Sequence, residues 1–205
     1  MMRAKLIPGV PQQMKGGFHD TETCKKFDNP ETATEQFEIL KRKFLAVNDW
    51  RSFCGEGFAD FKLFDSEGNF INRFPKEGDF IRIDIPGPGN SEAKGYDWVK
   101  ILNISEYHYN EILECYSMVC QPSENPQDKN NFHIAHFYSQ ESTSTFIICR
   151  GKNFIKAGIY GRNEYPNFNS SFLNKIRNLF IAIGGMIGFS KIQWKRLTNG
   201  FIDIN

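Results

Sequence analysis

The first clear hydrophobic pattern begins at Asn29 and has the period of an α-helix. Asn29 is a favourable N-cap residue, and Pro30 suits the first helical position, where a missing N–H costs nothing. Apolar side chains then recur at steps of three and four residues, at Phe37, Leu40, Phe44 and Val47. The spacing predicts an amphipathic helix from residue 30 to about Trp50, which the glycines at 55 and 57 end.

From residue 58 to residue 160, apolar positions alternate with polar ones, as in strands that have one buried face. The clearest run is the one in which Ile81, Ile83 and Ile85 alternate with Phe80, Arg82 and Asp84. Further strands are predicted at 98–104, 112–119, 134–138, 144–150 and 154–160. Because the connections are mostly short, as at 151–153, we expect an antiparallel meander of six or seven strands.

A second helix is predicted after the strands, with Asn169 or Ser170 as its N-cap and Gly200 at its end. Its apolar positions follow at steps of three and four residues: Phe172, Ile176, Leu179, Ile183, Met186, Trp194 and Leu197. The glycines near its centre suit close approach to strand backbones. An N-terminal helix and a long C-terminal helix packed on an antiparallel meander place the chain in the α+β class.

Residues 1–28 show no sustained period, and glycine and proline interrupt them at several points. We therefore expect a flexible N-terminal arm over 1–28, followed by a single α+β domain over 29–205. The order of elements resembles that of helix-grip lipid-binding domains, in which a curved antiparallel sheet holds a long C-terminal helix. No strand is predicted before the first helix, and no motif identifies that family.

Composition narrows the classes of function. The chain has 205 residues, 40% of them hydrophobic, and a formal net charge of +1. Such a chain buries enough apolar surface to fold, and it lacks the basic excess of a dedicated nucleic-acid binder. It contains no stretch of roughly 18 consecutive apolar residues, so no membrane span is expected. The N-terminus has no apolar run of signal-peptide length, and we expect a cytoplasmic protein.

Cysteine and histidine suggest no metal, cofactor or nucleophile. Five cysteines without close pairing favour small buried side chains over a disulfide framework, and Cys115 and Cys120 are expected on opposite faces of a strand. His133 and His136 also differ in parity, so they do not share a face as ligands. Because no catalytic motif is present either, we expect neither a cofactor nor a metal, and an enzyme is the less favoured class.

One candidate surface for a protein partner follows the third predicted strand. A Gly/Pro-rich loop over 86–95 is flanked by acidic and aromatic side chains that suit an interface: Asp84, Tyr96, Asp97 and Trp98. A strand rather than a helix follows this loop, so the loop is not expected to bind nucleotide phosphate. The alternative is that this loop is an ordinary connection between two strands of a hairpin.

A second candidate site gathers polar residues near the last two strands. The residues expected to converge at one end of the sheet and bind a small anionic or polar ligand are His136, Glu141, Arg150, Arg162 and Glu164. Arginine suits this role because its planar fork holds a carboxylate or phosphate with two hydrogen bonds. The alternative is a structural corner in which Arg162 and Glu164 pair with neighbours at a tight bend.

These observations predict a non-enzymatic interaction or accessory module that binds a protein partner. The alternative is a binder of a small apolar ligand, or an enzyme, with a Phe-lined cleft between the sheet and the C-terminal helix. The five lysines and arginines of the last helix have no nearby acids, which leaves nucleic-acid binding as a third and weaker hypothesis.

Overall fold

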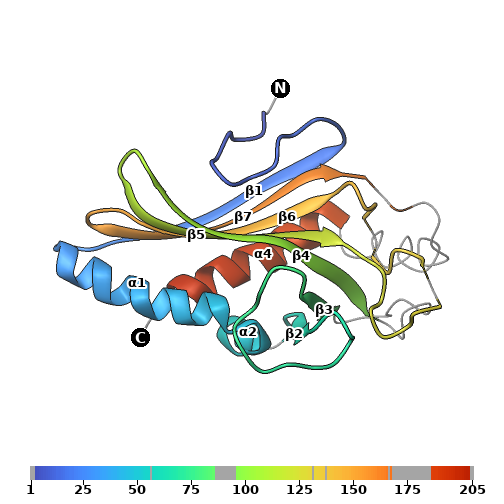
Figure 1. The fold of residues 1–205 in the computed structure, drawn as a ribbon. Coiled ribbons are helices and arrows are strands. Elements are labelled where there is room, and N and C mark those ends of the chain that lie inside the picture. The colour runs from blue at the N-terminus through green and yellow to red at the C-terminus, as the bar shows by residue number, and fades with distance from the viewer. Residues whose placement is uncertain are drawn as a thin grey trace.

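Seven antiparallel strands form one sheet, with the helices on one of its faces (Figure 1). The computed structural model describes residues 3–55, 57–85, 96–130, 132–136, 138–165, 167 and 186–203, without the side chains of 186–191. The strands are β1 (Gly17–Lys26), β2 (Asp60–Phe64), β3 (Phe80–Asp84), β4 (Asp97–Tyr109), β5 (Ile112–Pro122), β6 (Thr143–Arg150) and β7 (Phe154–Glu164). Their order across the sheet is β1-β7-β6-β5-β4-β3-β2. Strands β2 to β7 are therefore the predicted meander.

The first helix forms where the sequence predicts it. In α1 (Pro30–Leu45), the Asn29 side chain accepts a hydrogen bond from the Thr32 backbone N–H at 2.8 Å. The predicted stripe is buried: Phe37, Leu40 and Phe44 lie on α1. The helix ends at Leu45 rather than near Trp50, because the chain turns at Ala46 into a 3₁₀ turn, η1 (Val47–Asp49), and a short helix, α2 (Trp50–Cys54).

The absence of a strand before the first helix is a wrong prediction. Residues 17–26, which fall in the expected arm, form β1 and pair with β7 along their length. Among the described residues, the order of elements is therefore one strand, the helices α1 and α2, six strands and the helix at the C-terminal end. The rest of the expected arm, up to residue 16, forms no helix or strand in its described residues.

The C-terminal helix is described as α4 (Met186–Ile202), and its predicted start at 169–185 lies outside the described residues. The sequence predicts that Gly200 ends the helix, but Gly200 lies inside it. A Cβ at this position would come within 2.3 Å of the Phe53 carbonyl oxygen, so glycine allows α4 to touch α2. The helix packs on β1, where Trp194 stacks on His19 and Thr198 bonds to Thr23. No helix within the described ranges has the length and apolar character needed to cross a bilayer.

One predicted strand is missing. Described residues 134–136 form no strand, although Ala135 accepts a hydrogen bond from the Trp98 backbone N–H and donates one to Ser123. The segment therefore runs beside the end of β4 without extending the ladder. The other predicted strands are present, and the hairpin at 151–153 closes with a bond from Gly151 N–H to Phe154 O at 3.0 Å.

The N-terminal segment, residues 3–16, lies on the face of the sheet opposite the helices (Figure 1). We call it the strap. Ile7 and Val10 pack on a small cluster of side chains that point away from the helices: Cys115, Ile147, Cys149 and Tyr160. The Tyr107 hydroxyl donates to Pro8 O at 2.7 Å, and Arg162 donates to Lys5 O at 3.0 Å. The strap thus covers β5, β6 and β7 and reaches the far end of β4 at Tyr107.

Candidate functional site

The four predicted partner-binding residues do not form one exposed surface. Trp98 is fully buried and Asp97 is buried, so the prediction that they are exposed is wrong, whereas Asp84 is exposed and Tyr96 half-buried. Alternation along β4 explains this outcome, because Trp98 and Asp97 point to opposite faces and each meets side chains that cover it. The loop 86–95 lies outside the described residues.

Asp97 lies on the helix-facing side of the sheet, at the start of β4. Its register partner is Ile83, and the next residue on the same face is Val99. Burial raises the pKa of the Asp97 carboxyl to about 8, and one of its oxygens has no hydrogen-bond partner among the described residues. The group is therefore largely neutral at pH 7 and does not serve as an exposed acidic contact.

The outer side of β3 and β4 carries an arginine between two aromatic rings. The guanidinium of Arg82 lies 4.1 Å from the centre of the Tyr96 ring and 5.4 Å from that of Phe64. Arg82 is half-buried, and its Nε atom is buried with no hydrogen-bond partner in the described part of the chain. No ion pair joins it to a described acidic residue. Two rings therefore hold this charge, and none of the described residues supplies an acceptor.

Further aromatic and cationic side chains surround Arg82. The Lys100 ammonium lies 5.7 Å from the centre of the Phe80 ring, directly across the β3–β4 pair. Phe70 is 56% exposed, and its ring meets that of Phe64 at 6.0 Å. We call this surface the aromatic–cationic face and define it by Phe70, Phe80, Arg82, Tyr96 and Lys100.

Sequence reasoning found Tyr96 but missed the other members of this face. The signal was present in β3, where Phe80 and Arg82 occupy the positions that alternate with buried isoleucines. A large aromatic residue on the polar side of a half-buried strand indicates a second packing surface. Phe70 and Lys100 had no comparable signal, because their places depend on a loop contact and on strand register.

The predicted ligand site contains a structural arginine. Arg162 is 1% exposed, and it donates to the backbone oxygens of His19, Gly161 and Lys5 at 2.7–3.1 Å. Its Nη2 also lies 2.7 Å from an oxygen of Asp20. Because these groups occupy the guanidinium, Arg162 ties β1 and the strap to β7, as the structural-corner alternative predicts.

Glu164 belongs to a neighbouring contact on the other face. The Nδ1 atom of His19 lies 2.9 Å from Oε1 of Glu164, and both side chains are buried. Asn163 has a φ of 54°, and this left-handed residue turns Glu164 towards the helix side. Gly161 makes room for the pair, since a Cβ there would lie 2.3 Å from His19 Nδ1. The imidazole stacks on Trp194, so the pair joins β1, β7 and α4.

The remaining predicted ligand residues are spread over the sheet. Arg150 lies at the opposite end of β6 from Thr143, the register partner of Arg162, and bonds to Glu114. Glu141 pairs with Lys15 of the strap. His136 is buried, and desolvation lowers its pKa to about 3, so it stays neutral. The five residues therefore have separate surroundings rather than one shared pocket.

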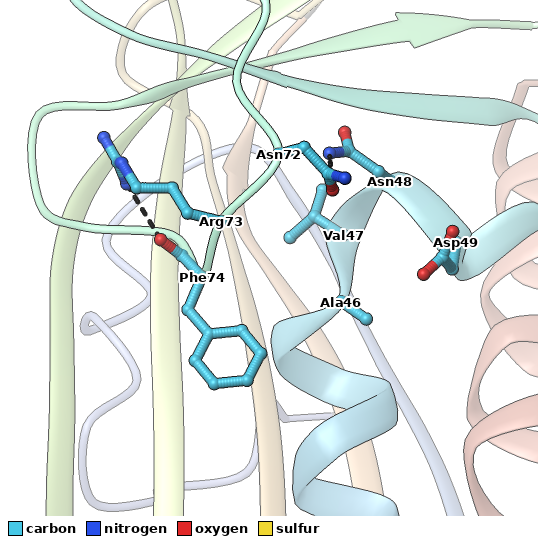
Figure 2. Close-up of a pocket in the computed structure, with 7 residues that line it drawn as sticks. All are labelled: Ala46, Val47, Asn48, Asp49, Asn72, Arg73 and Phe74. Carbon is cyan, nitrogen blue, oxygen red and sulfur yellow. Dashed lines mark hydrogen bonds between the residues drawn. The ribbon is translucent and has the colours of Figure 1, made fainter.

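A pocket of about 390 Å3 opens at the β2 edge, between the end of α1 and the loop that follows β2 (Figure 2). Figure 2 shows Ala46, Val47, Asn48 and Asp49 on one side of it and Asn72, Arg73 and Phe74 on the other. The loop is held firmly, because Arg73 binds Asp79 with both terminal nitrogens at 2.7 and 2.9 Å. The Asn48 side chain also donates to Ile71 O. The residues that line the pocket are both polar and apolar.

The described part of the interface between the helices and the sheet is filled by aromatic side chains. Trp50 is fully buried, and its ring centre lies 5.1–5.5 Å from those of Phe61, Phe146 and Phe201. Close packing of this kind removes space for a guest molecule between these elements. The abundant phenylalanine therefore serves mainly as core in this region.

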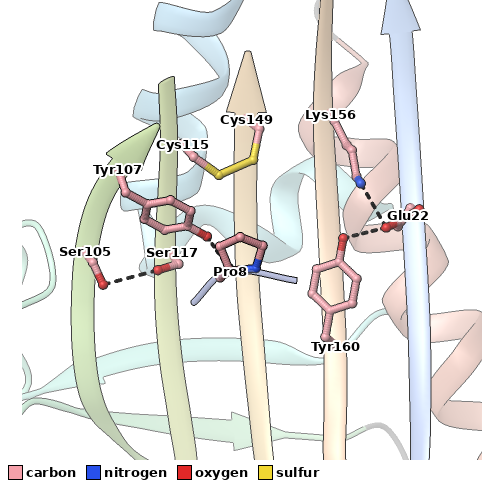
Figure 3. The surroundings of a disulfide bond; sticks show 9 residues. All are labelled: Pro8, Glu22, Ser105, Tyr107, Cys115, Ser117, Cys149, Lys156 and Tyr160. Atoms are coloured by element: carbon pink, nitrogen blue, oxygen red, sulfur yellow. Dashed lines mark hydrogen bonds and ion pairs between the residues drawn. A yellow bond between two sulfur atoms is a disulfide. The ribbon is translucent and has the colours of Figure 1, made fainter. Parts of the chain in front are cut away.

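The cysteines differ from the prediction in one respect. Cys115 and Cys149 are register partners on β5 and β6, and they form a disulfide where a framework was not expected (Figure 3). Figure 3 shows Pro8 of the strap and Tyr107 beside this bond. Cys120 lies in the core on the helix side, so the expected opposite placement of Cys115 and Cys120 is confirmed. No three His, Cys, Asp or Glu side chains of the described ranges cluster closely enough to hold a metal.

Comparison with known proteins adds little. No protein-family model matches the chain, and no curated protein does. Among solved structures, it is similar to protein Ms6760 from Mycobacterium smegmatis, with 13% identity over 89% of this chain and 88% of that one and a TM-score of 0.38. A likeness at this level carries no argument about function.

Proposed function

We propose that the chain is a non-enzymatic interaction module and that a protein partner docks on the aromatic–cationic face. The observation that carries the proposal is a group of partly exposed aromatic rings around an arginine that pairs with no described residue, on the part of the sheet that the strap does not cover. Tyrosine, phenylalanine and arginine are enriched in protein interfaces, and a few such residues supply most of the binding energy.

The structural use of the other polar groups supports the same proposal. Arg162, Glu164 and His19 are buried in contacts that join strands, the strap and α4. Groups that hold elements together in this way are not free to bind a substrate. The polar residues that most resembled a site in the sequence are thus better explained by stability than by chemistry.

The test compares two exposed apolar residues that differ in position. Phe70 is 56% exposed on the aromatic–cationic face, and Leu113 is 53% exposed on β5 next to the β4–β5 turn. Tagged wild-type, Phe70→Ala and Leu113→Ala proteins are used to capture partners from the native cell, and the recovered partner is then purified and titrated by calorimetry. We expect Phe70→Ala to weaken binding at least about tenfold, as for an interface hot spot, and Leu113→Ala to leave it unchanged. Equal affinity for both variants, with unchanged melting temperatures, would reject this surface.

A small-ligand function is our second candidate, and the pocket at the β2 edge favours it. Its volume lies within the range of ligand pockets, and Val47 and Phe74 give it apolar walls. A thermal-shift screen of small apolar compounds should then yield hits that Phe74→Ala abolishes. Hits that persist in Phe74→Ala would place the ligand elsewhere.

Location in the cytoplasm stays a prediction. Disulfides are typical of oxidising compartments, and the Cys115–Cys149 bond does not favour the cytoplasm. Cell fractionation with thiol labelling of the native protein decides between the two.

A further inference from the structure

We infer that the partner presents an extended acidic segment whose carboxylates pair with Arg82 and Lys100. This inference rests on the proposed function and specifies the chemistry of the partner. The first argument is the treatment of arginine elsewhere in the chain. Three other arginines each bind a carboxylate of this chain: Arg73 with Asp79, Arg150 with Glu114 and Arg162 with Asp20.

Arg82 differs from these three although it is half-buried, whereas the other described arginines without an ion pair, Arg3, Arg42 and Arg51, are exposed. Arg82 makes no hydrogen bond or ion pair with a described residue, and its guanidinium lies against the rings of Phe64 and Tyr96. Placing a charge in a partly desolvated position without an acceptor is costly. A partner that supplies carboxylate oxygens removes this cost, because a carboxylate matches the planar fork of the guanidinium.

The two rings also prepare Arg82 for binding. A guanidinium held 4.1 Å from the Tyr96 ring loses little further side-chain freedom when an acceptor arrives. Groups that are already ordered bind more tightly because association costs less entropy. The same argument applies more weakly to Lys100, which is exposed and whose ammonium lies over the Phe80 ring.

Strand register sets the spacing of the two cations. Lys100 is the register partner of Phe80, and Arg82 is two residues further along β3 on the same face. Such diagonal neighbours lie about 7–8 Å apart, and their Cβ atoms are somewhat closer. In an extended segment, side chains at positions i and i+2 point the same way and lie about 6.5–7 Å apart. Two acidic residues at i and i+2 therefore match Lys100 and Arg82.

Asp84 makes the order of charges next to Lys100 and Arg82 asymmetric. It is exposed and follows Arg82 at the next outward position of β3, and it has no ion pair with a described residue. The order along the face is thus positive, positive, negative. A segment that reads acid-x-acid-x-base complements it, and a like-charged residue opposite Asp84 weakens binding.

The experiment uses a peptide array and the full-length protein. Nine-residue peptides carry Glu-Thr-Glu-Thr-Lys at their centre, with matched peptides in which Gln replaces both Glu residues. We expect wild-type protein to prefer the Glu peptide at low salt and to lose affinity as salt rises. Arg82→Gln should weaken binding about tenfold and Lys100→Gln about threefold, in line with the strength of charge-assisted bonds at partly and fully exposed sites.

Two further variants keep the result interpretable. Lys152→Gln removes an exposed lysine at the distant β6–β7 turn and should change nothing. Arg82→Lys keeps the charge but not the planar fork, and we expect it to lose most of the Arg82 contribution. Circular dichroism confirms the fold of each variant.

The outcomes separate the two proposals. Equal binding of the Glu and Gln peptides, or none that depends on Arg82, overturns the acidic segment, while the proposed function still stands if partner binding depends on Phe70. Tighter Arg82-dependent binding of a single-stranded oligonucleotide than of any acidic peptide also overturns it, in favour of phosphate. If Phe70→Ala has no effect on partner binding, the proposed function itself fails.

Discussion

Two arginines on the same face of the sheet have opposite surroundings. Arg162 lies under the strap, where backbone oxygens and Asp20 occupy its guanidinium. Arg82 lies on the uncovered half, and aromatic rings hold it while no described acceptor binds it. Both guanidinium groups lie near aromatic rings, so the rings do not distinguish them. The two arginines differ in whether described residues supply acceptors. An arginine with its own acceptors stabilises the fold, whereas one without them is available to a partner.

We compare the covered half of the sheet, which lies under the strap, with the uncovered half, which the strap does not reach. The largest expected difference between them is the loss of unfolding free energy when these arginines are replaced. Arg162→Ala removes the hydrogen bonds to three backbone oxygens and the charge that faces Asp20, and it should lower the free energy of unfolding by about 3–5 kcal/mol. Arg82→Ala should cost less than about 1 kcal/mol, since it loses only contacts with rings. Urea unfolding followed by fluorescence measures both. Similar losses for the two variants would show that Arg82 is structural and would break the comparison.

The disulfide provides the next largest effect and concerns the covered half alone. Cys115 and Cys149 are 34 residues apart in sequence, and removing a link of that loop size lowers stability by about 2–4 kcal/mol. The double variant Cys115→Ala/Cys149→Ala should therefore melt earlier than wild type, while Cys24→Ala, which changes an exposed free cysteine, should not. Partner binding by the uncovered half is expected to persist in the double variant below its melting temperature.

A smaller effect should appear as acid sensitivity of the covered half. Burial acts to raise the pKa of Glu22, but hydrogen bonds from Lys5, Tyr160 and Lys156 outweigh it and lower the pKa to about 2. A carboxyl with a lowered pKa in the folded state stabilises the fold above its unfolded pKa and loses that contribution as pH falls. We expect a loss of about 1–2 kcal/mol between pH 4.5 and 2, after allowance for solvent screening.

Glu22→Gln provides the control for that pH dependence. It should reduce stability at pH 7 and flatten the profile below pH 4.5, as followed by thermal unfolding at a series of pH values. A profile that stays as steep in Glu22→Gln as in wild type would assign the acid sensitivity to other carboxyls.

The smallest expected effect distinguishes two lysines. Lys100→Gln on the uncovered half should change stability by no more than about 0.5 kcal/mol, because no described acid pairs with it. Lys156→Gln on the covered half breaks an ion pair with Glu22 at 2.9 Å and should cost about 0.5–1 kcal/mol. High salt should abolish the loss of stability in Lys156→Gln, and measurements at 0.05 and 1 M sodium chloride test this.

Local signals explain which parts of the fold could be predicted. The helix α1 has a cap, a proline and an apolar stripe within one segment, and β3 has strict alternation. The strand β1 has neither. Its residues that face α4 include His19, Thr21 and Thr23, and those on the outer face include Asp20 and Glu22, so both faces of this edge strand are polar. Only tertiary contacts show why it belongs to the sheet.

The same limit applies to the candidate sites. Arg162 and Glu164 stood out in the sequence, but their partners Asp20 and His19 are more than 140 residues away on the strand that was missed. Trp98 was chosen as an anchor by residue type, although burial decides its role. Arg82 belongs to no distinctive motif. It stands out because no described residue accepts a hydrogen bond from it, and only the packed structure reveals this.

The position of the disulfide beneath the strap has a kinetic consequence. Both cysteines are buried in a cluster against which Ile7 and Val10 pack, so we expect a reducing thiol to reach the bond mainly when the strap detaches. The rate at which a dithiol reagent cleaves the Cys115–Cys149 bond therefore measures how often the N-terminal segment lifts from the sheet. This rate can be measured in the intact protein without attaching a label.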